Sequence, residues 1–121
     1  MAAGGNLRVG AAGEQAAAEW YRSNGYAVVA RNWRDPGGEL DLVVARPGEL
    51  VFCEVKTRSS DRFGVPAEAV TPAKQRRLRA LAARFLASGS APPVPAGRPR
   101  TLRFDVVSVL AGEVSVIEAA F

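Results

Sequence analysis

The sequence predicts one α/β domain in which helices flank a mixed β-sheet, in the order α-β-β-β-α-β with room for one extra C-terminal strand. A chain of 121 residues is long enough for one compact domain and too short for two. Hydrophobic residues make up 48% of the chain, which indicates a packed core rather than disorder. Short apolar runs bounded by turn residues indicate strands, and two longer stretches have the spacing or composition of helices.

The N-terminal half is expected to hold one helix followed by three strands. Residues 1–10 are small and glycine-rich and are expected to be flexible, so the domain is placed at residues 11–118. Alanines favour a helix over residues 11–24. Turn sequences at residues 35–38 and 46–49 separate the second strand from its neighbours. The three predicted strands span residues 26–31, 39–45 and 50–57.

The C-terminal half is expected to hold a second helix, a connector and one or two strands. Thr71 is a candidate N-cap before Pro72, and apolar spacing predicts a helix over residues 72–87. The proline- and glycine-rich connector at residues 88–100 is expected to be mobile. Because a helix crosses between the third and fourth strands, these two strands are expected to be parallel. The last strands are predicted over residues 102–110 and 114–117.

The composition excludes several kinds of catalytic chemistry. Histidine is absent, which excludes histidine-containing triads, imidazole metal ligands and histidine general bases. Cys53 is the single cysteine, which excludes an intrachain disulfide and any multi-cysteine metal site. Chemistry in this domain would therefore rest on carboxylates, lysine, arginine, hydroxyls and an oxygen-liganded cation.

The charged residues favour an anionic partner. The net charge is +4, which is typical of proteins that bind nucleic acid. Of the 16 basic residues only Lys56 and Lys74 are lysines. Because the pKa of lysine, unlike that of arginine, shifts readily on burial, both are candidates for a chemical role. The chain has no apolar run of membrane-spanning length and no signal-peptide pattern, so we expect a cytoplasmic protein without a membrane partner.

Acidic residues and a lysine are expected to meet across the hairpin of the second and third strands. A turn at residues 46–49 sets a register in which Asp41 lies opposite Glu54 and Glu39 lies opposite Lys56. The other positions of this hairpin are mostly apolar, so the carboxylates are expected to be partly covered. Two covered carboxylates repel unless one is protonated or a cation neutralises them.

A hard divalent cation, Mg²⁺ or Mn²⁺, is the cofactor that this arrangement predicts. Asp41, Glu54 and the backbone carbonyl of Val55 would be its ligands. Lys56 would lie beside the ion, where an ammonium group can stabilise developing charge or help to deprotonate the attacking water. The alternative is an exposed charged stripe, which is the ordinary role of a Glu-x-Lys sequence on a strand.

These residues resemble the motif of the PD-(D/E)xK nuclease superfamily, whose restriction-endonuclease-like core is a mixed sheet flanked by helices. Asp41 matches the first acidic position and residues 54–56 match the D/E-x-K element, whereas Leu40 replaces the proline of the nominal motif. The chain is still more similar to the uncharacterised bacterial YraN-like family, small proteins related to Holliday-junction resolvases. That resemblance extends over residues 13–107 through the motifs Gly13-Glu14, Arg31-Asn32, Gly38-Glu39-Leu40-Asp41-Leu42, Phe52-Cys53-Glu54-Val55-Lys56-Thr57-Arg58, Phe63-Gly64 and Arg103-Phe104-Asp105-Val106-Val107.

The resemblance implies a metal-dependent endonuclease that hydrolyses phosphodiester bonds of DNA, branched or flapped structures included. Asp41, Glu54 and Lys56 would be its catalytic residues. In the resolvase-like branch a glutamate on the first helix joins the metal cluster, and Glu14 is the matching position; a favourable charge at the helix start is the alternative. Two other functions stay open: a non-catalytic nucleic-acid-binding module with this fold, and an RNA-processing nuclease. Double-strand cuts or junction resolution would require a homodimer.

Further residues are expected around this cluster. Lys74 and Gln75 start the second helix and would approach the site, with solvation of the helix end as the alternative. Glu39 would either hold Lys56 or form a cross-strand ion pair with it. Asp105 is expected to form a structural ion pair with Arg103. The basic residues expected to neutralise phosphates of a bound nucleic acid are Arg31, Arg34, Arg58, Arg62, Arg76, Arg77 and Arg79.

Overall fold

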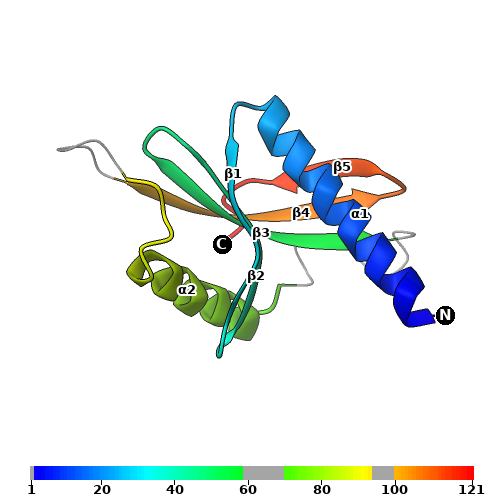
Figure 1. The fold of residues 1–121 in the computed structure, drawn as a ribbon, viewed down its shortest axis with the longest axis horizontal. Coiled ribbons are helices and arrows are strands. Elements are labelled where there is room, and N and C mark those ends of the chain that lie inside the picture. Colours follow the sequence, from blue (N-terminus) through cyan, green and yellow to red (C-terminus); the bar gives the residue numbers. More distant parts are fainter. Residues whose placement is uncertain (1, 59–69, 94–99) are drawn as a thin grey trace.

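The computed structural model describes residues 2–58, 70–93 and 100–121, which form a mixed five-stranded sheet with one helix on each face (Figure 1). The predicted fold class and element order are confirmed, including the extra C-terminal strand. Neither helix in these residues is long and apolar enough to cross a membrane. In chain order the elements are α1 (Ala2–Ser23), β1 (Ala27–Asp35), β2 (Gly38–Arg46), β3 (Glu49–Arg58), α2 (Pro72–Ala87), β4 (Thr101–Leu110) and β5 (Glu113–Ile117).

Most element bounds agree with the prediction, and two differ. Helix α2 has the predicted bounds because Thr71 caps it, its side-chain oxygen accepting the N–H of Lys74 at 3.2 Å. Helix α1 begins at Ala2 rather than at residue 11, since alanines on both sides of the N-terminal glycines sustain the helix. Strand β1 extends beyond residue 31, because its end pairs with β2 across a tight turn. Of the predicted mobile connector, residues 94–99 lie outside the described residues.

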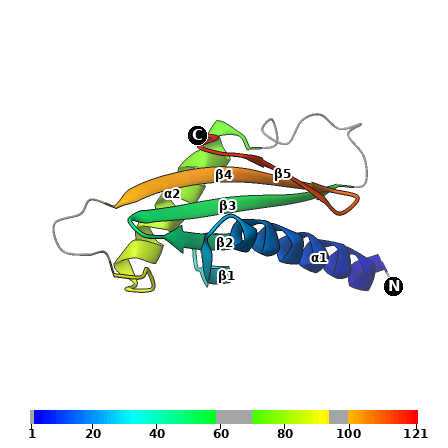
Figure 2. The same ribbon diagram turned by 90° about the horizontal axis from the view of Figure 1, so that it is seen from above.

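The sheet order is β1-β2-β3-β4-β5, and β3 and β4 are parallel, as predicted. The other neighbouring pairs are antiparallel. Figure 2 shows the crossover from β3 to β4 passing through α2, with β4 lying between β3 and β5. The central strand β3 is therefore paired on both sides and can carry buried side chains towards both helices.

The two faces of β3 build two separate cores, one under each helix. Leu50 and Phe52 pack in the core beneath α2, whereas Val51 and Cys53 pack in the core beneath α1. Phe85 of α2 is fully buried, and its ring meets the ring of Phe52 edge-on at a centroid distance of 5.9 Å. Strand alternation thus explains why β3 has an almost continuous apolar sequence.

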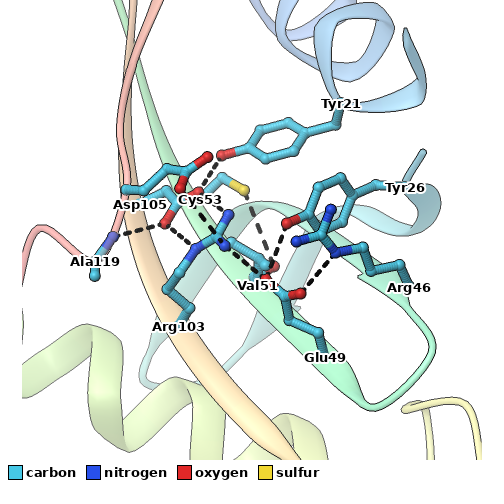
Figure 3. Close-up of polar contacts among 10 residues, drawn as sticks. Tyr21, Tyr26, Arg46, Glu49, Val51, Cys53, Arg103, Asp105 and Ala119 are labelled. Carbon is cyan, nitrogen blue, oxygen red and sulfur yellow. Dashed lines mark hydrogen bonds and ion pairs between the residues drawn. The ribbon is translucent and has the colours of Figure 1, made fainter. Parts of the chain in front are cut away.

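A buried polar network ties α1, β4 and the C-terminal segment together (Figure 3). Asp105 is fully buried, and Arg103 donates to both of its carboxylate oxygens at 2.8 and 2.9 Å. The Tyr21 hydroxyl donates to Asp105 at 2.6 Å, and the backbone N–H of Ala119 donates at 3.1 Å. The predicted structural ion pair of Asp105 and Arg103 is therefore confirmed. Burial, with smaller contributions from Cys53 and Asp105, raises the pKa of Tyr21 well above its usual range, so this hydroxyl remains a donor.

Helix α1 approaches β3 very closely at one glycine. Gly13 is buried, and a Cβ atom built on it would lie 2.0 Å from the Thr57 Oγ1 and 3.1 Å from the Thr57 Cβ. Any side chain larger than hydrogen at position 13 would therefore require Thr57 to move. This contact fixes the height of α1 above β3, one residue before Glu14.

Replacing Gly13 with alanine is expected to lower the free energy of unfolding by about 1–3 kcal/mol, because the added methyl group overlaps Thr57. At an open helix position the same change would stabilise the protein by about 1 kcal/mol. Urea unfolding followed by circular dichroism measures the difference. The double variant Gly13→Ala/Thr57→Ala should recover part of the loss. A single variant as stable as the wild type would contradict the close contact.

Candidate active site

Strands β2 and β3 separate at the end of their hairpin where the predicted acidic residues lie. The pairing follows the predicted register as far as Leu42–Cys53 and ends there. The next predicted pair, Asp41 with Glu54, is not part of the ladder, and this detail of the prediction is corrected. Instead, the Asp41 carboxylate accepts a hydrogen bond from the backbone N–H of Val55 at 2.9 Å. A side chain of β2 thus takes the place of a backbone partner.

The separation of the strands coincides with a change of face in β2. Leu42 packs in the core beneath α1, whereas Leu40 packs in the core beneath α2, so strict alternation breaks at Asp41. On β1, Asn32 has a φ of 51° and lies between Arg31 and Trp33, whose partners are Leu42 and Leu40. Asparagine tolerates this left-handed backbone better than most residues. The end of the β1–β2 hairpin therefore bends towards α2 and away from β3 (Figure 1).

Glu54 is buried, with 7% of its surface exposed, and both lysines of the chain contact it. The Nζ atoms of Lys56 and Lys74 lie 3.2 and 2.6 Å from the same oxygen, Oε1. Lys56 comes from the same strand as Glu54, and Lys74 comes from the first turn of α2. Burial lowers the pKa of Lys74, but the contact with Glu54 outweighs it, and the net direction is upward. The expected approach of Lys74 to this carboxylate is therefore present in the structure.

The surroundings of Asp41 disfavour its ionised form. Burial and, next, the charge of Glu54 raise the pKa of Asp41 to about 7, although the Val55 N–H acts in the opposite direction. The charges of Glu14 and Glu39 add to the increase. A cation placed beside Asp41 would favour its ionised form.

Glu14 lies on α1, next to the close contact between Gly13 and β3. It is half-buried, and its Oε2 atom accepts a hydrogen bond from the Asn32 side-chain amide at 3.0 Å. The charge of Glu14 contributes to the raised pKa of Asp41. The structure thus brings the helix glutamate to the same end of the sheet as Asp41.

Two residues predicted to support the site make their contacts elsewhere. Glu39 forms an ion pair with Arg34 at 3.4 Å instead of facing Lys56, because β2 has already turned away from β3 at this point. The Gln75 amide donates to the backbone carbonyl of Val70 at 3.1 Å, which closes the loop before α2. In these contacts neither side chain holds Lys56.

The arginines predicted to contact nucleic acid are dispersed over several elements. Arg31 on β1 donates to the Gln15 side chain at 2.8 Å, and the side chain of Arg34 is 80% exposed. Arg76 and Arg77 are exposed on α2, which also supplies Lys74 to the acidic cluster.

The remaining predicted arginines differ in their surroundings. The Arg79 guanidinium lies over the ring of Phe104 at 4.9 Å, so this residue packs against the core beneath α2. Arg58 ends β3 and is half-buried. Arg62 lies outside the described residues.

The oxygen atoms at the fork of β2 and β3, the place where the two strands separate after Leu42–Cys53, suit a hard cation. The carboxylates of Asp41 and Glu54 and the Val55 carbonyl are oxygen ligands of the kind that Mg²⁺ and Mn²⁺ prefer. In the described ranges no three acidic side chains converge into a closed metal-binding group. Mg²⁺ commonly uses one or two protein carboxylates and keeps several waters, so an open pair of acids fits it.

An apolar hollow of about 470 Å³ lies at the other end of the β2–β3 hairpin, beside the turn at residues 46–49. Its charged lining residues already have partners. Glu49 forms an ion pair with Arg103 at 2.6 Å, and Arg100 donates to the carbonyl of Pro92. We therefore place the candidate site at the acidic cluster rather than in this hollow.

The fold and the cluster together define a class of protein: a small α/β domain with an open mixed sheet and acidic and lysine residues where two strands separate. The model of the family described as "Uncharacterised protein family UPF0102" matches residues 13–109, and the chain belongs to this family. The YraN-like resemblance is consistent with that membership, and the matched range includes Glu14, Asp41, Glu54, Lys56 and Lys74.

Relatives in the same family cover most of the chain. A UPF0102 protein of Symbiobacterium thermophilum is 55% identical over 106 residues, which cover 87% of this chain and 84% of the relative. A UPF0102 protein of Beutenbergia cavernae is 57% identical over 103 residues, covering 84% and 81% of the two chains. A UPF0102 protein of Moorella thermoacetica is 47% identical over 121 residues, covering 94% and 95%.

Replacing Asp41 with asparagine is expected to stabilise the metal-free protein at pH 8 by about 1–3 kcal/mol. The pKa of Asp41 rises from 3.8 to about 7 on folding, so the wild type loses stability as pH increases through this range. Asparagine carries no charge, yet its oxygen still accepts the Val55 N–H. Urea unfolding in EDTA at pH 5 and pH 8 measures the effect.

The matched control is Glu113→Gln, which removes an exposed carboxylate at the start of β5. Its pH dependence should follow that of the wild type. If Asp41→Asn also loses stability between pH 5 and pH 8 as the wild type does, the charge repulsion assigned to Asp41 is wrong.

Proposed function

We propose that this protein is a divalent-metal-dependent nuclease that hydrolyses phosphodiester bonds of DNA. The observation that carries the proposal is the meeting of Asp41, Glu54 and Lys56 where β2 and β3 separate. These are the residues that match the PD-(D/E)xK motif. The half-buried, poorly balanced Asp41 is the group whose charge a bound cation would relieve.

The proposed roles follow from the positions of the side chains. Asp41, Glu54 and the Val55 carbonyl would hold Mg²⁺ or Mn²⁺, which supplies Lewis-acid charge and activation of water when it is bound. Lys56 lies 3.2 Å from the Glu54 carboxylate, so its ammonium group can stabilise negative charge that develops on a phosphate placed there. Lys74 places a second positive charge beside the same carboxylate and would raise the electrostatic potential around it.

The surface charge supports a nucleic-acid substrate. The net charge of +4 favours a polyanion, and Arg76 and Arg77 are exposed on the helix that also supplies Lys74. Phosphate contacts of this kind position a duplex but carry little sequence information. We therefore propose recognition of DNA by shape, with branched or flapped DNA as the substrates to test first.

A second candidate function is a nucleic-acid-binding module without catalysis. One observation favours it: two ammonium groups already neutralise Glu54, so the fold can balance this acid without a metal ion. Such a module would bind DNA in EDTA as tightly as in Mn²⁺ and would cleave nothing.

The variants Asp41→Asn, Glu54→Gln and Lys56→Ala are each expected to lower the rate of Mg²⁺- or Mn²⁺-dependent DNA cleavage by at least about 100-fold, since each removes a charge needed at the reacting phosphate. Cleavage of labelled duplex, flap and four-way-junction DNA, and of matched RNA, provides the measurement. Arg22→Gln removes an exposed positive charge at the end of α1 and is the control expected to cleave like the wild type.

Three outcomes separate the candidates. Cleavage that persists in EDTA or in all three site variants contradicts the proposed nuclease. Binding of DNA by the wild type without cleavage of any substrate supports the non-catalytic module. Cleavage of RNA with DNA left intact keeps the site and changes the substrate to RNA.

A further inference from the structure

Glu14 and Glu54 are held in different ways. Glu54 lies against two ammonium groups, which neutralise its charge. The Glu14 carboxylate instead accepts a hydrogen bond from the neutral side-chain amide of Asn32. A neutral donor fixes the direction of a carboxylate without cancelling its charge.

Asn32 has a second structural property that bears on this contact. It lies in β1 between Arg31 and Trp33, whose partners Leu42 and Leu40 flank Asp41 in β2. Its φ of 51° lies in the left-handed region, at the point where the hairpin bends away from β3. A single residue thus permits the bend that opens the site and carries the amide that reaches α1.

We propose that Asn32 is a positioning residue that holds the Glu14 carboxylate towards Asp41 and so strengthens cation binding at the fork of β2 and β3. This inference rests on the proposed function, because it assumes that a divalent cation binds there. Mutating a residue that hydrogen-bonds a metal ligand commonly lowers metal affinity by about 10–100-fold. Because the bond between Asn32 and Glu14 is exposed, we expect the lower end of that range.

A neighbouring contact provides a matched control. The Gln15 side chain accepts a hydrogen bond from Arg31 at 2.8 Å, so it joins the same helix to the same strand one residue away. Gln15 carries no charge and is not part of the proposed site. Gln15→Ala therefore removes a tie between α1 and β1 without removing the amide that holds Glu14.

The test is Mn²⁺ binding measured by isothermal titration calorimetry with the full chain. Asn32→Gly keeps the left-handed backbone and removes the amide, and we expect its Mn²⁺ affinity to fall about tenfold. Gln15→Ala should stay within about twofold of the wild type. In the Glu14→Gln background, Asn32→Gly should change the affinity by less than about twofold, because the residue acts through Glu14.

Thermal unfolding shows whether each variant is folded, and Asn32→Ser replaces Asn32→Gly if the glycine variant is not. An unchanged affinity in Asn32→Gly, or an equal loss in Gln15→Ala, overturns the role of Asn32 while the metal site stands. A full tenfold loss in the Glu14→Gln background also overturns it, since Asn32 would then act independently of Glu14. A wild type that binds no Mn²⁺ overturns the proposed metal site and this inference with it.

Discussion

The hydrogen bond from the Val55 N–H to the Asp41 carboxylate determines how this end of the sheet is built. In a regular antiparallel pair that backbone donor would be satisfied by the neighbouring strand. Here a side chain satisfies it, so β2 can leave β3 after Leu42–Cys53 without a lost hydrogen bond. Asp41 and Glu54 are therefore not a directly opposed pair, as they would be in a continuous ladder.

The charges around this opening are balanced unequally. Glu54 is buried and has two lysine partners, one from its own strand and one from the capped start of α2. The Asp41 carboxylate accepts a hydrogen bond from the Val55 backbone N–H, and its pKa rises to about 7. Because the lysines already neutralise Glu54, a single cation beside Asp41 would compensate the remaining negative charge. The lysines would keep their positive charge next to that cation.

Much of this arrangement can be predicted because it depends on local signals. The turn at residues 46–49 sets the β2–β3 register, Thr71 and Pro72 set the start of α2, and the scarcity of lysine indicates that Lys74 has a specific role. The bend at Asn32 cannot be predicted in this way, because a left-handed residue within a strand leaves the alternating pattern almost unchanged. For that reason Glu39 was expected beside Lys56, and the contact between Asn32 and Glu14 was missed.

Asp105 and Asp41 differ in how completely hydrogen bonds from the protein compensate their charge. Asp105 receives hydrogen bonds from a guanidinium, a phenol and a backbone N–H, and so the chain itself satisfies a fully buried acid. Such complete pairing is expected where an acid serves the fold. Asp41 lies where the regular pattern of both β1 and β2 is interrupted, and its charge is left in excess. Departures from the regular pattern of a strand are where functional sites are expected, which is why the proposed chemistry is placed at Asp41 and not at Asp105.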